Sequence, residues 1–220
     1  MSSASDALDS VKSLFKNTNI QLRPHQEEGI RWMLQLEERG TGGLLADDPG
    51  LGKTFQALAL AQSGKNLFVV PTSILAQWRD AAVRLFGDDE VLVFHGSKRK
   101  PSAMRSTRIV ITTYGLLRSD VALLRPTWAR VVLDEVHTIK SARSKTSQAA
   151  MNLRARFRWG LSGTPVQNKI AETANLFRFI LGSEHKPLDV PLLLRSHTLR
   201  RLKEKVLGDQ LPGIDIKTHH

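Results

Sequence analysis

Short runs of apolar residues alternate with longer amphipathic stretches along most of this chain, and this alternation restricts the possible folds more than any other feature. The apolar runs lie at residues 43–46, 66–70, 90–94, 108–112, 129–133 and 157–162. Helical patterns lie between them at residues 53–62, 73–86, 145–153 and 172–181. Continuous apolar strands separated by helices indicate βαβ units with right-handed crossovers. The sequence therefore predicts an α/β fold, in which a mainly parallel sheet carries helices on both faces.

The two ends of the chain depart from this pattern. Residues 1–20 are rich in Ser, Asn, Asp and Lys and have weak periodicity, so we expect a frayed or loosely docked lead-in. A helix is then predicted to begin at Pro24 and to end before Gly40. From about Ser183, two prolines precede a basic helical stretch that ends at Pro212-Gly213. Residues 183–220 are therefore predicted to begin a separate segment.

Composition and charge exclude several classes of protein. The 220 residues contain no cysteine, which excludes a disulfide scaffold and a Cys-ligated zinc or iron–sulfur site. The longest apolar runs, LFVVP and VPLLL, are far shorter than the roughly 18 residues that cross a bilayer. The start, MSSASDALDS, lacks the basic and apolar regions of a secretory signal. A net charge of +11 favours a polyanionic partner, and it also fits a soluble basic protein.

The positive charge is concentrated in two stretches without acidic residues. The first runs from Val91 to Ser119 and carries Lys98, Arg99, Lys100, Arg105, Arg108 and Arg118. The second runs from Val136 to Ala171 and carries Lys140, Arg143, Lys145, Arg154, Arg156, Arg158 and Lys169. Either stretch alone fits a solvated surface as well as it fits a surface that faces phosphates. The presence of two such stretches favours the phosphate-facing surface.

A glycine-rich turn, DDPGLGKT at residues 47–54, follows the first predicted strand and leads directly into a predicted helix. Such a turn lets backbone N–H groups approach phosphate oxygens, and the helix dipole adds a favourable potential. We expect Lys53 to neutralise the β and γ phosphates of a nucleotide and the Thr54 hydroxyl to bind Mg²⁺. Asp47 stands where the usual G-x-x-x-x-G-K-[ST] pattern has its first glycine. The alternative is an ordinary strand-to-helix connection.

Two adjacent carboxylates, Asp134 and Glu135, follow the apolar strand at residues 129–133. This is the carboxyl end of the strand, where open α/β sheets bind ligands. We expect Asp134 to hold Mg²⁺ through water, and Glu135 to orient and deprotonate the attacking water. An N-cap for the next helix is the alternative interpretation. His137 is expected at most to couple sites, because a lone histidine is usually structural.

The next predicted strand ends in LSGTPVQN, residues 161–168. Ser162, Gly163 and Thr164 supply hydroxyls and a flexible turn at the sheet edge where the phosphate loop and the acidic pair are expected. A plain Gly-Thr-Pro turn is the alternative.

These segments, in this order, resemble helicase superfamily two, and within it the Swi/Snf-type DNA translocases. The resemblance rests on LRPHQEEGIRWM, LLADDPGLGKT, FVVPTSILAQW, VITTYGLL, LDEVH and LSGTPVQN, which cover residues 22 to about 182. It implies a RecA-like P-loop NTPase lobe at residues 21–182, after a lead-in at 1–20. It also implies that residues 183–220 are a connector toward a second RecA-like lobe, which this chain lacks.

The resemblance implies roles for individual residues. The catalytic set is Lys53, Asp134 and Glu135. The ATP-binding set is Gln26, which would read the adenine, together with Asp48, Pro49, Gly50, Leu51, Gly52, Lys53 and Thr54. The residues that couple nucleotide state to DNA grip are His137, Ser162, Gly163, Thr164 and Gln167. The residues that face the DNA backbone are Pro71, Thr72, Ser73, Thr112, Thr113, Tyr114 and Lys140. The cofactors are ATP and Mg²⁺, with Thr54 and Asp134 at the metal.

The sequence departs from the family pattern at two places. Asp48-Pro49 stands where Glu-Met is usual, and Val136 stands where alanine or glycine is usual. Neither change removes a group assigned to chemistry, and we expect Pro49 to stiffen the loop.

The resemblance implies an ATP-dependent translocase on double-stranded DNA that remodels protein–DNA complexes. Its partners would be the DNA backbone, the second lobe and DNA-bound proteins such as histones, with no membrane. It would be nuclear in a eukaryote and cytoplasmic otherwise, and the 220-residue chain alone would be nearly inactive. Two alternatives are an RNA helicase or nuclease-associated motor lobe, and a nucleic-acid-binding module that does not hydrolyse ATP.

Overall fold

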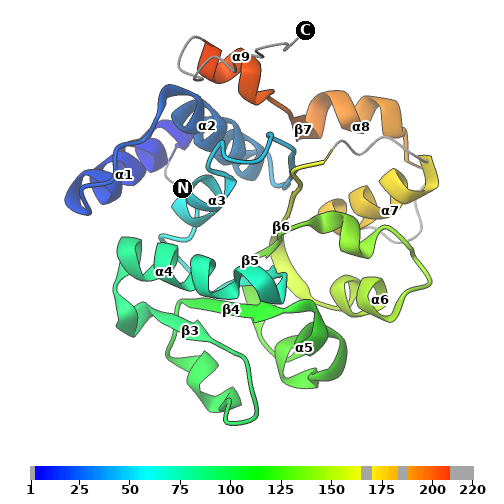
Figure 1. Ribbon diagram of the computed structural model, residues 1–220. Coiled ribbons are helices and arrows are strands. Elements are labelled where there is room, and N and C mark those ends of the chain that lie inside the picture. Colours follow the sequence, from blue (N-terminus) through cyan, green and yellow to red (C-terminus); the bar gives the residue numbers. More distant parts are fainter. Residues whose placement is uncertain (1–2, 165–169, 183–187, 209–220) are drawn as a thin grey trace, which may run out of the picture.

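A seven-stranded sheet forms the centre of the computed structural model, which describes residues 3–164, 170–182 and 188–208 (Figure 1). The strands are β1 (Leu44–Leu45), β2 (Asn66–Val70), β3 (Val91–Val93), β4 (Ile109–Thr113), β5 (Thr127–Leu133), β6 (Arg154–Leu161) and β7 (Thr198–Leu199). Their order is β3-β4-β2-β5-β6-β1-β7, and every pairing is parallel. The predicted parallel α/β fold is confirmed.

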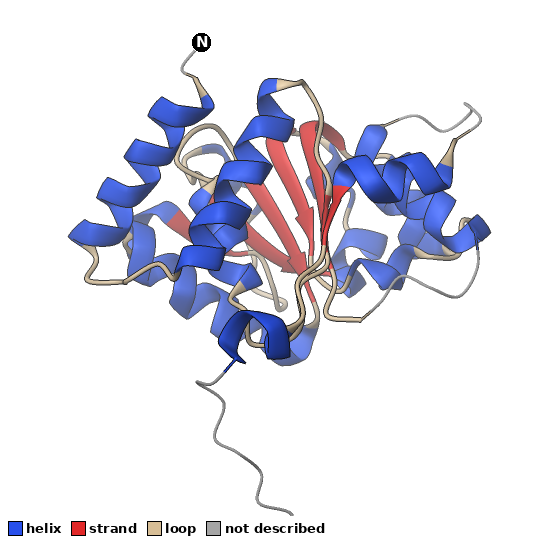
Figure 2. Ribbon diagram, turned by 90° about the horizontal axis from the view of Figure 1, so that it is seen from above, coloured by secondary structure: helices blue, strands red, loops and turns tan. Residues whose placement is uncertain are grey.

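Helices cover both faces of this sheet (Figure 2). One face packs against α1 (Ala4–Asn17), α2 (Pro24–Glu38), α3 (Lys53–Ala59) and α4 (Leu75–Phe86). The other packs against α5 (Tyr114–Ser119), α6 (Lys145–Met151) and α7 (Ile170–Leu181). The chain then forms α8 (Val190–His197) and α9 (Lys203–Leu207). Short 3₁₀ turns are η1 (Thr72–Ile74), η2 (Asp88–Glu90), η3 (Pro101–Arg105), η4 (Val121–Leu124) and η5 (Val136–Ile139).

The central strands are apolar on both of their faces, because helices cover both faces of the sheet. Along β2, Phe68 and Val70 belong to the core beneath α1–α4, while Leu67 and Val69 belong to the core on the opposite face. Successive side chains of a strand point to opposite faces, so a strand covered on both sides must be apolar throughout. The predicted strands and helices are present with ends within three residues of those predicted. No helix among the described residues is long and apolar enough to cross a membrane.

The amino-terminal residues differ from the expectation. Residues 4–17 form α1, and Ser3 caps it, because the Ser3 hydroxyl accepts from the Asp6 N–H while the Asp6 carboxylate accepts from the Ser3 N–H. Leu8, Val11 and Phe15 lie on one side of the helix, are at most 5% exposed and join the core. The prediction of a frayed or loosely docked lead-in is therefore wrong for these residues. Ser3 and Asp6 form the cap of this helix, and its other Ser and Asp residues lie on the side that faces solvent.

Replacing Phe15 with alanine should lower the free energy of unfolding by about 3–5 kcal/mol, because the substitution leaves a cavity under α1. Phe15 is 2% exposed, and its ring lies edge-on to Phe55 with the centroids 6.2 Å apart. Urea denaturation of the 220-residue chain measures the change. Asp9→Ala, at an exposed position of the same helix, is the control and should change stability by less than about 0.5 kcal/mol. Equal stabilities would mean that α1 is not part of the cooperative fold.

The carboxyl-terminal segment also differs from the expectation. The predicted basic helical stretch is interrupted, because β7 separates α8 from α9. Leu199 pairs with Leu45 of β1, and the Ala46 N–H donates to the Leu199 carbonyl at 2.7 Å. The sheet therefore continues past the predicted boundary at residue 182. Periodicity does not indicate a two-residue strand, since its hydrogen bonds go to a partner about 150 residues away.

Candidate active site

The residues predicted for nucleotide chemistry follow the carboxyl ends of parallel strands. The phosphate loop follows β1, Asp134 and Glu135 follow β5, and Ser162 follows β6. Because all these strands are parallel, their carboxyl ends meet at one edge of the sheet, where α/β folds bind ligands. Strand β6 lies between β1 and β5, so the phosphate loop and the acidic pair flank the turn at Ser162.

A cavity of about 490 Å³ brings the phosphate loop and the acidic pair together. Of the predicted residues, it is lined by Gly50, Gly52, Lys53, Thr54, Asp134 and Glu135. Its remaining lining residues were not predicted, and they are Phe55 of α3 and Gln77, Asp80, Ala81 and Arg84 of α4. Gln77 lies within the segment FVVPTSILAQW, but sequence patterns gave no signal for Asp80, Ala81 and Arg84. A helix that packs against a sheet shows a pattern only on its apolar side.

The phosphate loop needs glycine at two positions. Gly50 and Gly52 have φ angles of 87° and 79°, a left-handed conformation that disfavours side chains. A Cβ atom at Gly52 would also lie 2.0 Å from the Gln26 amide nitrogen. The loop therefore bends sharply while it stays in contact with α2.

Lys53 reaches back across the loop. Its Nζ donates to the Asp47 carbonyl at 2.6 Å and to the Asp48 carbonyl at 3.3 Å. Burial lowers the pKa of Lys53, and the nearby carboxylates, Asp134 foremost, oppose that effect. The ammonium thus occupies the site with only partial compensation for its lost water. A phosphate group would supply the missing negative charge.

Asp134 is held in one orientation by two donors. Trp78 Nε1 donates to Oδ2 at 2.8 Å, and the Glu135 N–H donates to Oδ1 at 2.9 Å. Burial raises the pKa of Asp134, and the neighbouring Glu135 charge raises it further, while the Trp78 hydrogen bond and Lys53 lower it. Trp78 was not predicted as a site residue. It comes from the segment FVVPTSILAQW, whose final Trp was the available signal.

Glu135 has an unusual backbone and an unsatisfied carboxylate. Its φ of 50° is left-handed, which is uncommon for a residue other than glycine and is often found at functional sites. Its Oε2 is buried and has no hydrogen-bond partner. His137 Nδ1 lies 3.3 Å from this oxygen, a distance suited to an ion pair, but without hydrogen-bond geometry. The carboxylate therefore keeps a free acceptor, as a residue that takes a proton from water requires.

The donor set fits magnesium. Mg²⁺ is usually held by one or two carboxylates together with substrate phosphates and water. Asp134 and Thr54, the two residues expected at the metal, line one cavity with the phosphate loop. Among the described residues, no group of three or more His, Cys, Asp or Glu side chains forms a complete protein cage. A metal here would therefore be shared with a bound phosphate.

Gln26 lies against the phosphate loop. Its amide Nε2 donates to the Leu51 carbonyl at 3.4 Å, and its Oε1 accepts from the Arg23 N–H at 2.9 Å. His25 Nε2 lies 3.1 Å from the same Leu51 carbonyl. The start of α2 is thus tied to the loop, and the adenine contact of Gln26 stays a prediction.

The turn after β6 touches the phosphate loop. Ser162 is fully buried, and its hydroxyl donates to the Thr164 carbonyl at 3.0 Å. A Cβ atom at Gly163 would lie 3.1 Å from the Pro49 ring and 3.6 Å from Lys53 Nζ. This proximity suits a residue that senses the loop, although the coupling role itself stays a prediction. Gln167 lies outside the described residues.

The residues predicted to face DNA divide into two groups. Thr72, Ser73 and Lys140 are exposed and Pro71 is partly exposed, and all four follow strands at the same sheet edge. Thr112, Thr113 and Tyr114 are engaged inside the protein. Thr112 donates to the Phe94 carbonyl at 2.9 Å, Thr113 is 3% exposed, and the Tyr114 hydroxyl donates to the Asp134 carbonyl at 2.6 Å.

The hydroxyls of Thr112 and Tyr114 are therefore already bonded within the protein, and the DNA contacts of the three residues stay a prediction. The Thr112 and Tyr114 hydroxyls satisfy backbone carbonyls that need a donor, and the Thr113 side chain is buried. Burial also raises the pKa of Tyr114 well above its usual value. The sequence pattern placed these residues correctly at a strand end, but it could not show which way each side chain points.

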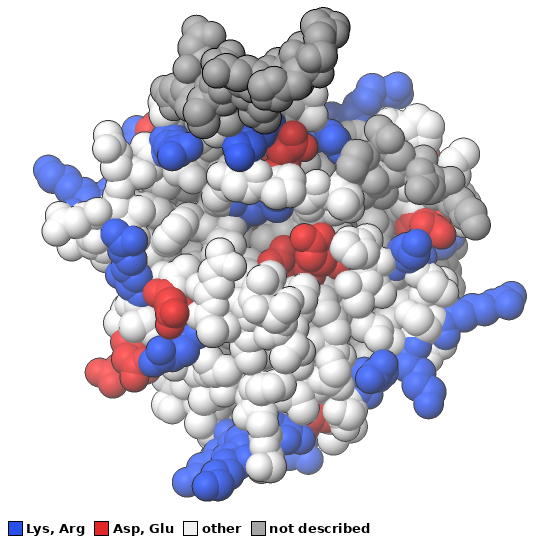
Figure 3. Space-filling view, in the orientation of Figure 1, with Lys and Arg blue, Asp and Glu red and all other residues white. Residues whose placement is uncertain are grey.

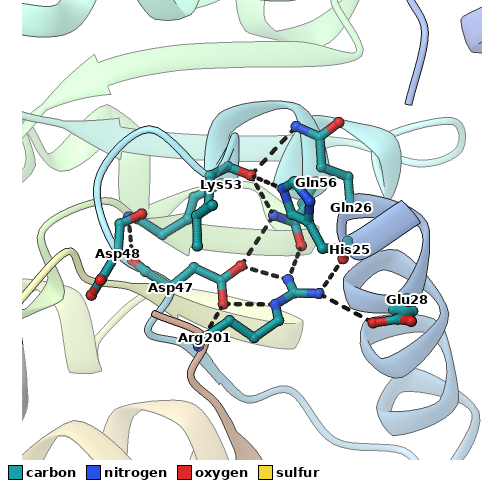
Figure 4. Close-up of polar contacts among 9 residues, drawn as sticks. His25, Gln26, Glu28, Asp47, Asp48, Lys53, Gln56 and Arg201 are labelled. Atoms are coloured by element: carbon teal, nitrogen blue, oxygen red, sulfur yellow. Dashed lines mark hydrogen bonds and ion pairs between the residues drawn. The ribbon is translucent and has the colours of Figure 1, made fainter. Parts of the chain in front are cut away.

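Arg201 was not predicted at the site. Figure 4 shows its guanidinium between the Asp47 carboxylate, the Gln56 side chain and the start of α2. Asp47, which replaces the usual first glycine of the loop, is fully buried. The two residues are 154 positions apart, so no local pattern connects them.

A phosphate loop after β1, an acidic pair after β5 and an intervening strand β6 define a RecA-like lobe of the P-loop NTPase class. The sequence profile of the SNF2-related domain matches residues 25–190. The chain therefore belongs to the SNF2-related domain family.

Sequence and structure comparisons with individual proteins give matches that are consistent with this family. YwqA of Bacillus subtilis (strain 168), whose name describes an ATP-dependent helicase/translocase, is 36% identical over 88% of this chain and 24% of its own length. Helicase swr1 of Schizosaccharomyces pombe is 33% identical over 78% of this chain and 14% of its own length. The SWI2/SNF2 ATPase core of Sulfolobus solfataricus in complex with dsDNA matches with a TM-score of 0.76 and 28% identity. That match covers 87% of this chain and 47% of the other. The chain thus spans less than half the length of these relatives.

Proposed function

We propose that this chain is the ATP-binding lobe of an ATP-dependent motor that translocates on double-stranded DNA. The observation that carries the proposal is the single cavity shared by Lys53, Asp134 and Glu135. Support for DNA as the track comes from the SWI2/SNF2 ATPase core of S. solfataricus, which was solved in complex with dsDNA. Because this chain spans 47% of that structure, a second RecA-like lobe would complete the motor.

In this proposal each residue has a separate task. Lys53 leaves the Asp47 and Asp48 carbonyls and binds the β and γ phosphates. Asp134, oriented by Trp78, would hold Mg²⁺ together with Thr54. When bound, Mg²⁺ neutralises charge on the phosphates. Glu135 orients the attacking water and accepts its proton.

The second lobe would supply an arginine that stabilises charge on the γ phosphate, an effect worth about 10³–10⁵ in rate. This is why we expect the chain alone to hydrolyse ATP only at a trace rate. Remodelling of DNA-bound proteins such as histones, in the nucleus of a eukaryote or the cytoplasm of a bacterium, is the finer part of the proposal. It rests on the resemblance alone.

ATP hydrolysis by the protein that contains both lobes tests the proposed function. The assay compares stimulation by duplex DNA, single-stranded DNA and RNA at equal nucleotide concentration. Stimulation mainly by duplex DNA is the expected result. Stimulation mainly by RNA would favour an RNA helicase, and the absence of hydrolysis under all conditions would favour a module that only binds nucleic acid.

A basic loop at the carboxyl end of β3 offers a test of the DNA-facing surface. Figure 3 shows basic side chains gathered at the lower edge of the molecule, below β3 and α5 in the view of Figure 1. Lys98 and Lys100 in this loop are exposed. Arg99 instead pairs with Asp120, with Nε 2.8 Å from Oδ2, and donates to the Gly96 carbonyl. Of these three described side chains, the two lysines are therefore the ones without a protein partner and are free to neutralise phosphates.

Replacing Lys98 and Lys100 with glutamate should weaken duplex binding and flatten its salt dependence. Each lost phosphate contact reduces the slope of log affinity against log salt by about 0.9. Fluorescence anisotropy with a labelled duplex at several NaCl concentrations measures the slope. Lys12→Glu with Lys16→Glu on α1 makes the same charge change at another surface and should leave the slope nearer its original value. An unchanged slope in the loop variant would mean that the loop is only a solvated surface.

A further inference from the structure

Arg201 forms a buried, two-point ion pair with the phosphate loop. It lies two residues beyond β7, and its side chain is 13% exposed. Its Nε donates to Asp47 Oδ1 at 3.0 Å, and its second terminal nitrogen donates to Oδ2 at 2.5 Å. Asp47 has no exposed surface. A charged pair in this setting is costly to separate, because each charge would lose its oppositely charged partner while it stays buried.

The same guanidinium connects the elements that surround the loop. It donates to the His25 carbonyl of α2, and to Gln56 Oε1 of α3 at 2.9 Å. Gln56 in turn donates to the Leu51 carbonyl at 3.3 Å, the carbonyl that Gln26 also contacts. Figure 4 shows the Asp47 and Gln56 side chains and the start of α2 around the Arg201 guanidinium. Arg201, which lies far from the loop in the sequence, thus holds the loop against α2 and α3.

The backbone after β7 runs along the backbone of the loop. The Arg201 N–H donates to Asp47 Oδ1 at 3.1 Å, and the Asp48 N–H donates to the Arg201 carbonyl at 3.0 Å. Two residues later, the Lys203 N–H donates to Asp48 Oδ2 at 2.9 Å. The carbonyls of Asp47 and Asp48 meanwhile accept from Lys53 Nζ. Asp47 and Asp48 therefore bond both to the ammonium expected to bind phosphate and to the segment that leaves the sheet.

We propose that Arg201 is a positioning residue that couples occupancy of the phosphate loop to the segment at residues 198–204. This inference rests on the proposed function, since it needs a nucleotide in the loop. When phosphates bind, Lys53 leaves the Asp47 and Asp48 carbonyls. The position of the loop then depends on its remaining hydrogen-bond partners, chiefly Arg201. By linkage, a segment that stabilises the occupied loop is itself stabilised when the nucleotide binds. In a two-lobed motor this segment leads toward the second lobe, so it would carry nucleotide state out of the site.

Hydrogen–deuterium exchange of the 220-residue chain, with and without magnesium and ATPγS, tests this coupling. The nucleotide should slow exchange in residues 48–54, and also in residues 198–204, which include the bonded N–H groups of Arg201 and Lys203. Arg201→Lys keeps the charge but loses the planar fork that makes two parallel bonds. In this variant, protection should persist at 48–54 and disappear at 198–204, and ATPγS should bind about tenfold more weakly. Arg195→Lys, at an exposed position of α8, is the matched control and should behave like the parent chain.

The outcomes separate this inference from the proposed function. If ATPγS protects no segment of the parent chain, the proposed nucleotide site is incorrect. If it protects residues 48–54 but leaves 198–204 unchanged, or protects both segments equally in Arg201→Lys, the coupling is overturned. If Arg201→Lys fails to fold by circular dichroism, Asp47→Asn removes the same ion pair from the loop side while keeping its shape. It should show the same selective loss of protection at 198–204, and full protection there would again overturn the coupling.

Discussion

Replacing Lys53 with alanine is expected to reduce the affinity of the 220-residue chain for ATP by at least about a hundredfold. The ammonium is partly desolvated by burial, and Asp134 and the other carboxylates around it compensate this only in part. Its hydrogen bonds go to the Asp47 and Asp48 carbonyls, which are neutral. A phosphate in the loop would exchange these for charge-assisted bonds, which are roughly twice as strong as neutral ones. Titration with a fluorescent ATP analogue measures the loss.

Lys65→Ala is a matched control for this variant. The Lys65 ammonium also donates to two backbone carbonyls, those of Met104 and Arg105, at 2.9 and 2.5 Å. The two substitutions therefore remove the same kind of contact, but only one lies in the cavity of the acidic pair. The control should bind the analogue like the parent chain. Equal affinities for Lys53→Ala and the parent would show that the loop does not hold phosphate.

The parts of the fold and site that the sequence predicted depend on short stretches of chain. Apolar runs along β2 and β5 mark strands because both faces of the sheet are covered, and the chemistry-bearing residues stand where those runs end. Lys53 and the pair Asp134 and Glu135 could therefore be placed at one sheet edge without a structure. The shared cavity also needs the strand order β5-β6-β1 and the side chains of α4, which the sequence did not predict.

The parts that the sequence did not predict depend on distant partners or on backbone angles. Leu8, Val11 and Phe15 recur at helical spacing along α1. The Ser, Asp and Lys residues between them made this apolar periodicity too weak to predict a docked helix. Arg201 meets Asp47 across 154 positions, and Trp78 meets Asp134 across 56. Thr112 stands at the expected strand end, yet its hydroxyl is bonded to a carbonyl inside the protein. Such contacts are decided by packing, which a local pattern does not contain.

Glu135→Gln is expected to leave ATP binding nearly unchanged and to slow hydrolysis by about 10²–10⁴-fold in the protein that contains both lobes. The left-handed backbone at Glu135 turns its carboxylate toward the cavity of Lys53 and Asp134. One carboxylate oxygen has no hydrogen-bond partner in the protein, so its lone pairs are not committed to another group. Glutamine preserves the size of the side chain but cannot accept a proton from water. Steady-state hydrolysis with duplex DNA and a parallel nucleotide titration measure the two effects separately.

The separation of binding from hydrolysis is what identifies the role of Glu135. Glu38→Gln, at an exposed position at the end of α2, makes the same chemical change away from the cavity and should alter neither quantity. If binding and hydrolysis of Glu135→Gln fall together, the carboxylate is needed to shape the site rather than to activate water. If hydrolysis persists, another base accepts the proton. His137 is then the first residue to replace, because its Nδ1 lies 3.3 Å from the Glu135 carboxylate.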